Sequence, residues 1–265
     1  MIQELKTGFN SGNTQSIGWR LAQIKALKLM LDEHKEKLLE VLHKDLKKSA
    51  FEGFCEISLI KTEINFAIKN LKAWVKPEKV KTSLVLQPGV SLIYKQPLGV
   101  VLIVGEWNYP LYVLLVPLIG ALASGNCAVL KPSEIAAHTS KLLAQLIPQY
   151  LDIECIKVVE GGIPETTTLL NEPFDHIFFT GSGRVARIFI EAAAKHLTPV
   201  SLELGGKSPC VVDYDTDIKT ACRRIVWGKF CNAGQTCVAP DYVLVHADIE
   251  MQLLEQLKRT IQEWH

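Results

Sequence analysis

The fold is decided by the stretch HIFFTGSGRVA, residues 176–186. A short apolar run leads into two glycines one residue apart, and a helix-like segment follows over residues 184–196. The letters satisfy G-x-G-x-x-G/A at a strand-to-helix junction, where free backbone N–H groups at a helix start favour a phosphate. Alone the pattern is weak, because a tight structural turn gives the same letters. The strand also comes late, whereas such a turn usually follows the first strand of a sheet.

Short apolar runs of the same kind recur on both sides of this stretch and alternate with helix-like segments. They occupy residues 100–104, 128–130, 155–159, 176–179 and 200–202. This alternation indicates a parallel sheet covered by helices on both faces. The sequence therefore predicts an α/β fold with a doubly wound, Rossmann-like sheet. The loops that follow the strands are the places to search for a ligand site.

The rest of the chain divides into three further regions. Residues 1–81 carry apolar side chains at helical spacing and predict an N-terminal helical region. Residues 82–96 alternate around Pro88-Gly89 and predict a bridging hairpin. The sheet then occupies residues 97–205, and a second α/β unit begins at residue 206. This unit has two candidate strands, 209–212 and 242–245, and two candidate helices, 216–230 and 249–264, so we expect residues 206–265 to form an incomplete domain.

The composition argues against several classes of function. Lys and Arg number 29 against 28 Asp and Glu, so the net charge of +1 gives no reason to expect a nucleic acid. Residues 100–123 contain one charged side chain, Glu106, and are long enough to cross a bilayer. Gly, Asn and Pro interrupt that run, and a buried strand followed by a buried helix explains it better. Seven cysteines without CxxC spacing or a secretory leader favour a reduced, cytoplasmic protein without a metal site.

Polar residues that can do chemistry follow the predicted strands. Asn108 could donate its side-chain amide to an oxyanion, or it could cap the next helix. Lys131 and Glu134 could hold ribose hydroxyls, although a serine cap followed by a helix gives the same letters. Glu203 lies about twenty residues after the glycine turn and beside two glycines. It could bind a ribose hydroxyl or act as a general base, and spacing alone does not decide between these roles.

Cys237 ends the loop NAGQTC, residues 232–237, and small polar residues flank it. A cysteine after a glycine-containing loop could be an exposed nucleophile, although a single cysteine is more often a small buried thiol. We expect Cys237 to react before the other six cysteines. Cys231 is ambiguous, and the remaining five lie in apolar surroundings: Cys55, Cys127, Cys155, Cys210 and Cys222.

Taken in order, these motifs resemble the NAD(P)-dependent aldehyde dehydrogenases. The resemblance rests on EWNYP (106–110), VLKPSE (129–134), FTGSG (179–183), LELGGK (202–207) and GQTC (234–237). GGIPETT (161–167) and KHLTPV (195–200) are most similar to the class 3 branch, whose members act on fatty and aromatic aldehydes. The resemblance covers nearly the whole chain.

The resemblance implies NAD- or NADP-dependent oxidation of an aliphatic or aromatic aldehyde to a carboxylic acid. Cys237 matches the family's nucleophile, Glu203 its general base and Asn108 its oxyanion-stabilising amide. Residues 97–205 would form the dinucleotide-binding domain and residues 206–265 the catalytic domain. The matching cofactor residues are Lys131 and Glu134 for the adenosine ribose, and Gly181, Ser182, Gly183, Arg184, Val185 and Ala186 for the pyrophosphate.

The sequence departs from the family pattern in two places. Ala186 stands where many relatives have glycine, and the Glu-x-Phe-Gly-Pro motif that follows the cysteine is absent. We therefore expect the first part of an aldehyde dehydrogenase, inactive alone. The alternatives are a non-catalytic dinucleotide-binding remnant, an acyl-CoA or acyl-phosphate reductase of the same fold, and a thiol redox sensor. The resemblance also implies a homodimer for a full-length form, and in some relatives a membrane-binding C-terminal tail.

Overall fold

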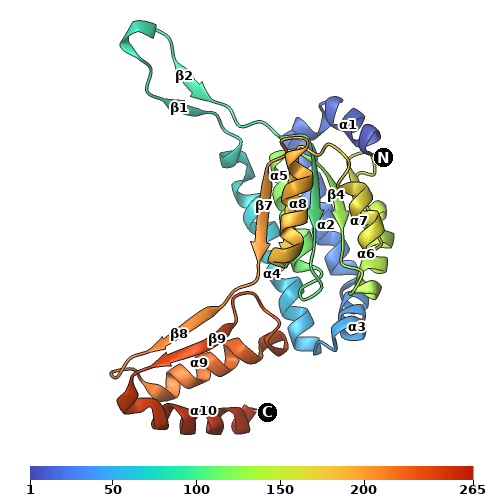
Figure 1. The fold of residues 1–265 in the computed structure, drawn as a ribbon. Coiled ribbons are helices and arrows are strands. Elements are labelled where there is room, and N and C mark those ends of the chain that lie inside the picture. The colour runs from blue at the N-terminus through green and yellow to red at the C-terminus, as the bar shows by residue number, and fades with distance from the viewer. Residues whose placement is uncertain (265) are drawn as a thin grey trace. The chain divides into compact units, whose positions relative to one another are not determined.

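The computed structural model describes residues 1–264 and divides the chain into two compact units, Met1–Glu203 and Leu204–His265 (Figure 1). The first unit contains the large sheet and most of the helices. The second contains a small sheet with its own helices. The functional roles that the sequence suggests for these regions stay predictions.

A five-stranded sheet forms the centre of the first unit. Its strands follow the order β5-β4-β3-β6-β7. β3 pairs in parallel with both β4 and β6, and β4 pairs in parallel with β5. Every residue of β3 and β4 is buried, which is why these strands appear in the sequence as continuous apolar runs. The predicted α/β fold is confirmed. The strand bounds are β3 Val100–Val104, β4 Cys127–Lys131, β5 Ile156–Val158, β6 His176–Gly181 and β7 Val200–Leu204.

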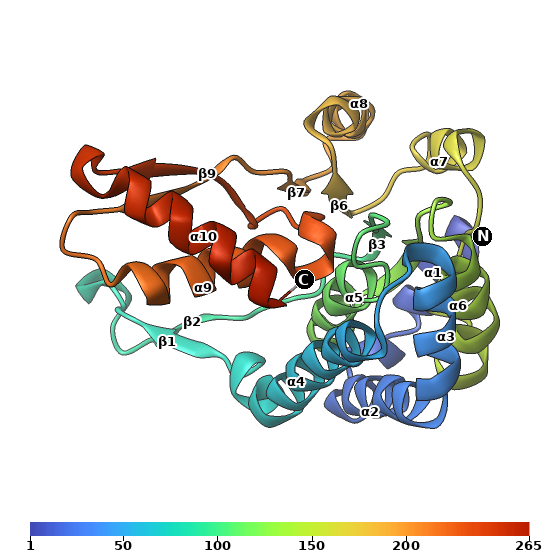
Figure 2. The same ribbon diagram turned by 90° about the horizontal axis from the view of Figure 1, so that it is seen from below.

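Helices cover both faces of this sheet. Figure 2 shows α7 and α8 on one side and α2, α3, α4, α5 and α6 on the other, so the doubly wound arrangement is present. The helix bounds are α1 Ile2–Asn10, α2 Ile17–Glu33, α3 Lys35–Leu46, α4 Ala50–Trp74, α5 Tyr112–Ser124, α6 Ala137–Tyr150, α7 Ile163–Leu169 and α8 Gly183–Ala194, with a short 3-10 helix η1 at Asn13–Gln15.

The long uncharged run at residues 100–123 is divided between β3 and α5. α5 spans 13 residues and contains Pro117. Among the helices of residues 1–264, none combines the length and the apolar character needed to cross a membrane.

The hairpin begins earlier than the sequence predicted. β1 (Glu78–Val80) pairs antiparallel with β2 (Ser91–Ile93), so the first strand precedes residue 82. The apolar residues 84–86, which we expected to extend a strand, form the 3-10 helix η2 instead. In this turn the backbone N–H of Leu86 donates to the carbonyl of Ser83 at 3.0 Å, and such local bonds replace strand pairing.

The second unit pairs two strands in parallel, β8 (Ser208–Val212) and β9 (Pro240–Val245). Its two long helices are α9 (Ile218–Phe230) and α10 (Glu250–Trp264), and the 3-10 helices η3 (Cys231–Gly234) and η4 (Ala247–Ile249) lie between the main elements. All four elements that the sequence predicted here are present. Their shared core is small and contains Val212, Cys222, Ile249 and Leu253.

One buried ion pair ties the N-terminal helices to α5. Lys48 Nζ lies 2.5 Å from Glu56 Oε2, and the two side chains are 2% and 0% exposed. The other carboxylate oxygen of Glu56 accepts hydrogen bonds from the backbone N–H groups of Leu111 and Tyr112, at 2.9 and 3.0 Å. A helix start leaves such donors without partners inside the helix, so Glu56 of α4 caps α5. Lys48 Nζ also lies 4.1 Å from the centroid of the Tyr109 ring.

We predict that Glu56→Gln lowers the free energy of unfolding by about 3 kcal/mol, because it leaves the buried Lys48 ammonium without a counter-charge. Urea unfolding followed by circular dichroism measures the change. The matched control is Asp32→Asn, which removes the half-exposed Lys61–Asp32 pair and should cost less than about 1 kcal/mol. Equal losses in the two variants would contradict the prediction.

Candidate functional site

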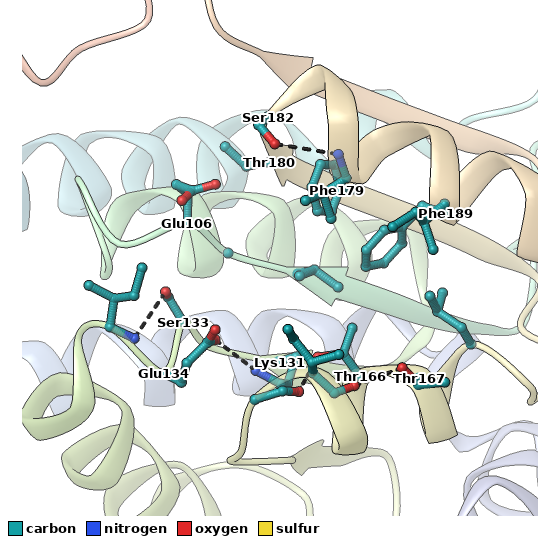
Figure 3. A pocket seen from close by; sticks show the side chains of 18 of the residues that line it. Glu106, Lys131, Ser133, Glu134, Thr166, Thr167, Phe179, Thr180, Ser182 and Phe189 are labelled. Atoms are coloured by element: carbon teal, nitrogen blue, oxygen red, sulfur yellow. Dashed lines mark hydrogen bonds and ion pairs between the residues drawn. The ribbon is translucent and has the colours of Figure 1, made fainter.

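A cavity of about 410 Å³ opens at the carboxyl ends of β3, β4 and β6. Its walls come from the loops after these strands and from α7 and α8, and Figure 3 shows the side chains that line it. Parallel sheets bind ligands at this end, and the volume is within the range of small-molecule sites. The cavity is therefore the candidate site of the first unit.

The glycine turn at the end of β6 leads directly into helix α8. Ser182 is the N-cap of α8, and its Oγ accepts a hydrogen bond from the backbone N–H of Val185 at 3.4 Å. A Cβ atom on Gly181 would lie 2.5 Å from Cζ of Phe179 and 2.6 Å from Oε2 of Glu106, so any larger residue would have to displace these two side chains. The positive end of the α8 dipole and its first backbone donors suit a phosphate group.

Lys131 and Glu134 lie together on the wall formed after β4. The Lys131 side chain is 2% exposed, and its Nζ lies 3.8 Å from Oε2 of the exposed Glu134. Nζ also donates to the carbonyl of Pro132 at 2.8 Å. Burial lowers the pKa of Lys131, and the neighbouring carboxylates of Glu134 and Glu165 oppose this shift. The pair presents donors and acceptors suited to ligand hydroxyls.

Glu106 also lines the cavity, and sequence reasoning did not assign it a role. Figure 3 shows its carboxylate between Ser182 and the segment that carries Ser133 and Glu134. Burial raises the pKa of Glu106, the charge of Glu134 adds to this, and a hydrogen bond from the backbone of Trp107 opposes it. The available signal was its position as the one charged residue in a long uncharged run.

The apolar side chains that line the cavity were also not identified from the sequence. Ile135, Ile163 and Ile188 line the cavity and are 61%, 79% and 50% exposed. Exposed aliphatic side chains around a concavity can cover a flat ring. Ile163, Thr166 and Thr167 all line the cavity and belong to the segment 161–167. In the sequence this segment indicated the class 3 branch and was not assigned a place in a binding site.

The structure brings five of the predicted cofactor residues to the cavity: Lys131, Glu134, Ser182, Arg184 and Val185. Gly181 and Gly183 form the adjoining turn. Ala186 is 2% exposed and packs into the core, which explains why a small residue stands there. Asn108 and Glu203 do not line this cavity. Asn108 is half-buried in the loop after β3, and Glu203 is exposed near the end of β7.

Cys237 belongs to the second unit, where it is exposed, while the other six cysteines are buried or half-buried. Its loop contains three successive residues with left-handed backbone, Asn232, Ala233 and Gly234, at φ values of 54°, 54° and 76°. Glycine adopts this conformation freely and asparagine tolerates it, so the strain falls mainly on Ala233. A Cβ on Gly206 would lie 2.4 Å from the Cys237 carbonyl oxygen, so the two-glycine motif and the cysteine loop touch. The assignment of Cys237 as a nucleophile stays a prediction.

Comparison with known proteins identifies the family. The model described as "Aldehyde dehydrogenase family" matches residues 1–265. The chain is 48% identical to the dimeric NADP-preferring aldehyde dehydrogenase of Canis lupus familiaris, covering 100% of this chain and 59% of that protein. It is 46% identical to aldehyde dehydrogenase family 3 member A2 of Macaca fascicularis, covering 100% of this chain and 55% of that relative. The chain thus spans little more than half the length of these relatives.

Solved structures agree with these relatives. Substrate-bound AldH of Staphylococcus aureus superposes with a TM-score of 0.96 at 44% identity, over 99% of this chain and 57% of that one. Betaine aldehyde dehydrogenase of the same species, solved in complex with NAD⁺, gives a TM-score of 0.89 at 26% identity, over 99% of this chain and 52% of that one. The predicted resemblance to the class 3 branch is confirmed by the family 3 relatives, and the chain belongs to the aldehyde dehydrogenase family.

Proposed function

We propose that this chain binds NAD or NADP and carries the reactive groups of an enzyme that oxidises aldehydes to carboxylic acids. The observation that carries the proposal is the cavity at the strand ends, with its glycine turn and its buried Lys131, in a chain of the aldehyde dehydrogenase family. The neighbours that contain NAD⁺ and the NADP-preferring relative support the choice of cofactor.

The residues around the cavity fit a dinucleotide. The start of α8 at Ser182, with its free backbone N–H donors at the cavity wall, suits a pyrophosphate. Lys131 and Glu134 would hold the hydroxyls of the adenosine ribose. Ile163 and Ile188 would cover the adenine ring, since both are exposed at the cavity wall. When bound, the cofactor supplies an acceptor for the hydride that leaves the substrate.

The chain's own residues would carry the remaining chemistry. The thiolate of Cys237 adds to the aldehyde carbon, and the side-chain amide of Asn108 donates to the oxygen that becomes negative. After loss of hydride the acyl group is a thioester on Cys237. Glu203 takes a proton from the water that attacks this thioester and releases the carboxylic acid. The exposure of Cys237 and of Glu203 supports access of substrate and water to them.

We further infer a cytoplasmic homodimer. The support is that the relative from Canis lupus familiaris is named as dimeric, together with the reduced cysteines that the sequence favours. Membrane association of a longer form, which the class 3 resemblance allows, stays a prediction.

A negative charge at Ser182 tests the pyrophosphate assignment. We predict that Ser182→Asp weakens binding of NAD⁺ or NADP⁺ at least about tenfold, because a carboxylate can still cap α8 but repels the phosphates. Calorimetric titration of the 265-residue chain measures the affinity. Ser182→Asn is the matched control, since it caps without charge and should stay within about threefold of the parent chain. Equal affinity in the Asp and Asn variants would exclude a phosphate at this turn.

Removal of the carboxylate at Glu106 should strengthen dinucleotide binding, whereas a carboxylate added at Ser182 should weaken it. Because the pKa of Glu106 is raised, the group is neutral at lower pH and becomes charged as pH rises through that pKa. The charged form faces the proposed phosphates, so dinucleotide affinity should fall as pH rises. We predict that Glu106→Gln binds more tightly at neutral pH and loses this dependence.

The measurement for Glu106 is a series of titrations that starts near the ordinary pKa of a glutamate, at about pH 4, and continues to about pH 8. Glu172→Gln serves as control, because Glu172 is exposed and does not line the cavity. A parent chain whose affinity is constant with pH, or a Glu106→Gln variant that keeps the parent's slope, would show that Glu106 does not face the phosphates.

The reaction itself is tested in a version extended to the length of the relatives. We predict that Glu203→Gln keeps a rapid first turnover of NADH but slows the steady state at least about 100-fold, because only release of the acid needs the base. Cys237→Ser should abolish both phases. Stopped-flow absorbance with a medium-chain aldehyde separates them. Loss of both phases in Glu203→Gln would place its action earlier, and no NADH from the parent protein would refute the proposed function.

A further inference from the structure

Two adjoining cavities lie beside the start of α2, and they share no lining residue with the cavity at the strand ends. The larger has a volume of about 440 Å³ and the smaller about 180 Å³. Both are lined by Arg20, Val75, Lys95 and Gln96. These residues come from α2, from the end of α4 and from the segment between β2 and β3.

Arg20 is a buried cation with neutral partners. The residue is 7% exposed, and its guanidinium donates through Nε to the carbonyl of Thr14 at 3.0 Å and through Nη1 to that of Ala123 at 3.1 Å. A guanidinium has five N–H donors, so these two bonds leave part of its fork for another acceptor. Within the part of the chain that the structure describes, no ion pair includes Arg20. Its charge is therefore uncompensated by a carboxylate.

The guanidinium is held in place by the backbone beneath it. Gly125 ends α5 with φ of 87°, and a Cβ there would lie 2.6 Å from Nη2 of Arg20. The planar group thus lies directly against the backbone, and its hydrogen bonds to Thr14 and Ala123 are both directed to backbone carbonyls. Thr14 next to it has a buried hydroxyl, Oγ1, with no hydrogen-bond partner in the described structure. Such a fixed fork has little entropy left to lose when an anion binds.

The surroundings of Arg20 are positive. Lys95 is a second cation on both cavities, and Gln96 and Gln15 add side-chain amides. Among the described residues, the lining of these two cavities includes no Asp or Glu. Burial also lowers the pKa of Arg20. A buried charge is costly unless it is paired, so the arrangement favours an incoming anion.

We propose that these cavities bind a phosphomonoester dianion, with Arg20 and Lys95 contacting its phosphate group. Arginine forks match phosphate oxygens in pairs, and lysine adds a second point of charge. The larger cavity exceeds the space that a phosphate needs and leaves room for an organic group. Phe9, Ile17 and Val75 would contact the apolar part of that group. This site is separate from the proposed dinucleotide cavity and does not depend on the proposed function.

The first test is calorimetric titration of the chain with inorganic phosphate at constant ionic strength. We expect saturable binding to the parent chain and at least about tenfold weaker binding to Lys95→Gln, since the variant loses a charge-assisted contact. Lys79→Gln is the matched control, because Lys79 is an exposed lysine on β1 outside both cavities. Lys95 is itself exposed, so its replacement should leave the fold intact. Equal affinities in the parent and Lys95→Gln would overturn the proposal.

Phosphate could instead bind at the glycine turn, and one variant separates the two places. In Ser182→Asp we expect the phosphate binding that depends on Lys95 to persist, whereas any phosphate binding at the glycine turn should be lost. Loss of phosphate binding in Ser182→Asp with retention in Lys95→Gln would move the phosphate to the strand-end cavity and overturn the proposal. Acetate that binds as tightly as phosphate would also overturn it, by showing general attraction of anions.

Two further binding experiments identify whether the phosphomonoester is a free metabolite or a lipid headgroup. One uses glycerol 3-phosphate in solution, and the other uses phosphatidylcholine vesicles that contain phosphatidic acid. Binding of glycerol 3-phosphate that weakens in Lys95→Gln supports the site with a free metabolite. Vesicle binding that weakens in this variant supports the same chemistry on a lipid. If neither arm responds to Lys95→Gln, the proposal is wrong.

Discussion

The buried carboxylate of Glu56 is the constraint on which the rest of the first unit depends. One of its oxygens pairs with Lys48 and the other caps the start of α5, so a single group joins the connection after α3, the helix α4 and the loop after β3. That loop carries Asn108. Its other end is held where the Gly105 backbone N–H donates to the Lys131 carbonyl at 3.1 Å. A side chain proposed to stabilise an oxyanion needs such fixed ends, because a loosely held donor contributes little.

Burial of the central strands decides where the chemistry can lie. β3 and β4 have no exposed residue, so the polar side chains of these two central strands and their loops lie where the strands end. Lys131, the last residue of β4, marks the point where the apolar strand gives way to polar side chains. Its buried ammonium is stabilised by the hydrogen bond to the Pro132 carbonyl and by the nearby carboxylate of Glu134. The same geometry brings Glu106 to the glycine turn. The cavity is thus a consequence of a sheet covered on both faces.

The sequence predicted the parts of the fold that local pattern controls. Strands buried on both faces appear as apolar runs, and each predicted run lies on an observed strand to within two residues. What it could not predict depends on contacts between distant segments. Arg20 meets the carbonyl of Ala123 across 103 positions, and Glu56 meets Leu111 across 55. The letters of α2 and α4 give no sign that these two charges are buried. The predicted hairpin began too late in the sequence because residues 84–86 are apolar like those of a strand, although their backbone forms a 3-10 helix.

The charges of the two sites explain why they suit different ligands. The strand-end cavity has two cationic residues, Lys131 and Arg184, and two carboxylates, Glu106 and Glu134. With side-chain charge balanced, attraction of a pyrophosphate would rest on the backbone donors of α8, whose reach is short and directional. The cavities at Arg20 have cations without carboxylates among the described residues. Uncompensated charge favours a compact dianion over an extended ligand, because the whole ligand charge then lies beside both cations. The balance of charge, more than cavity size, therefore separates the two kinds of ligand.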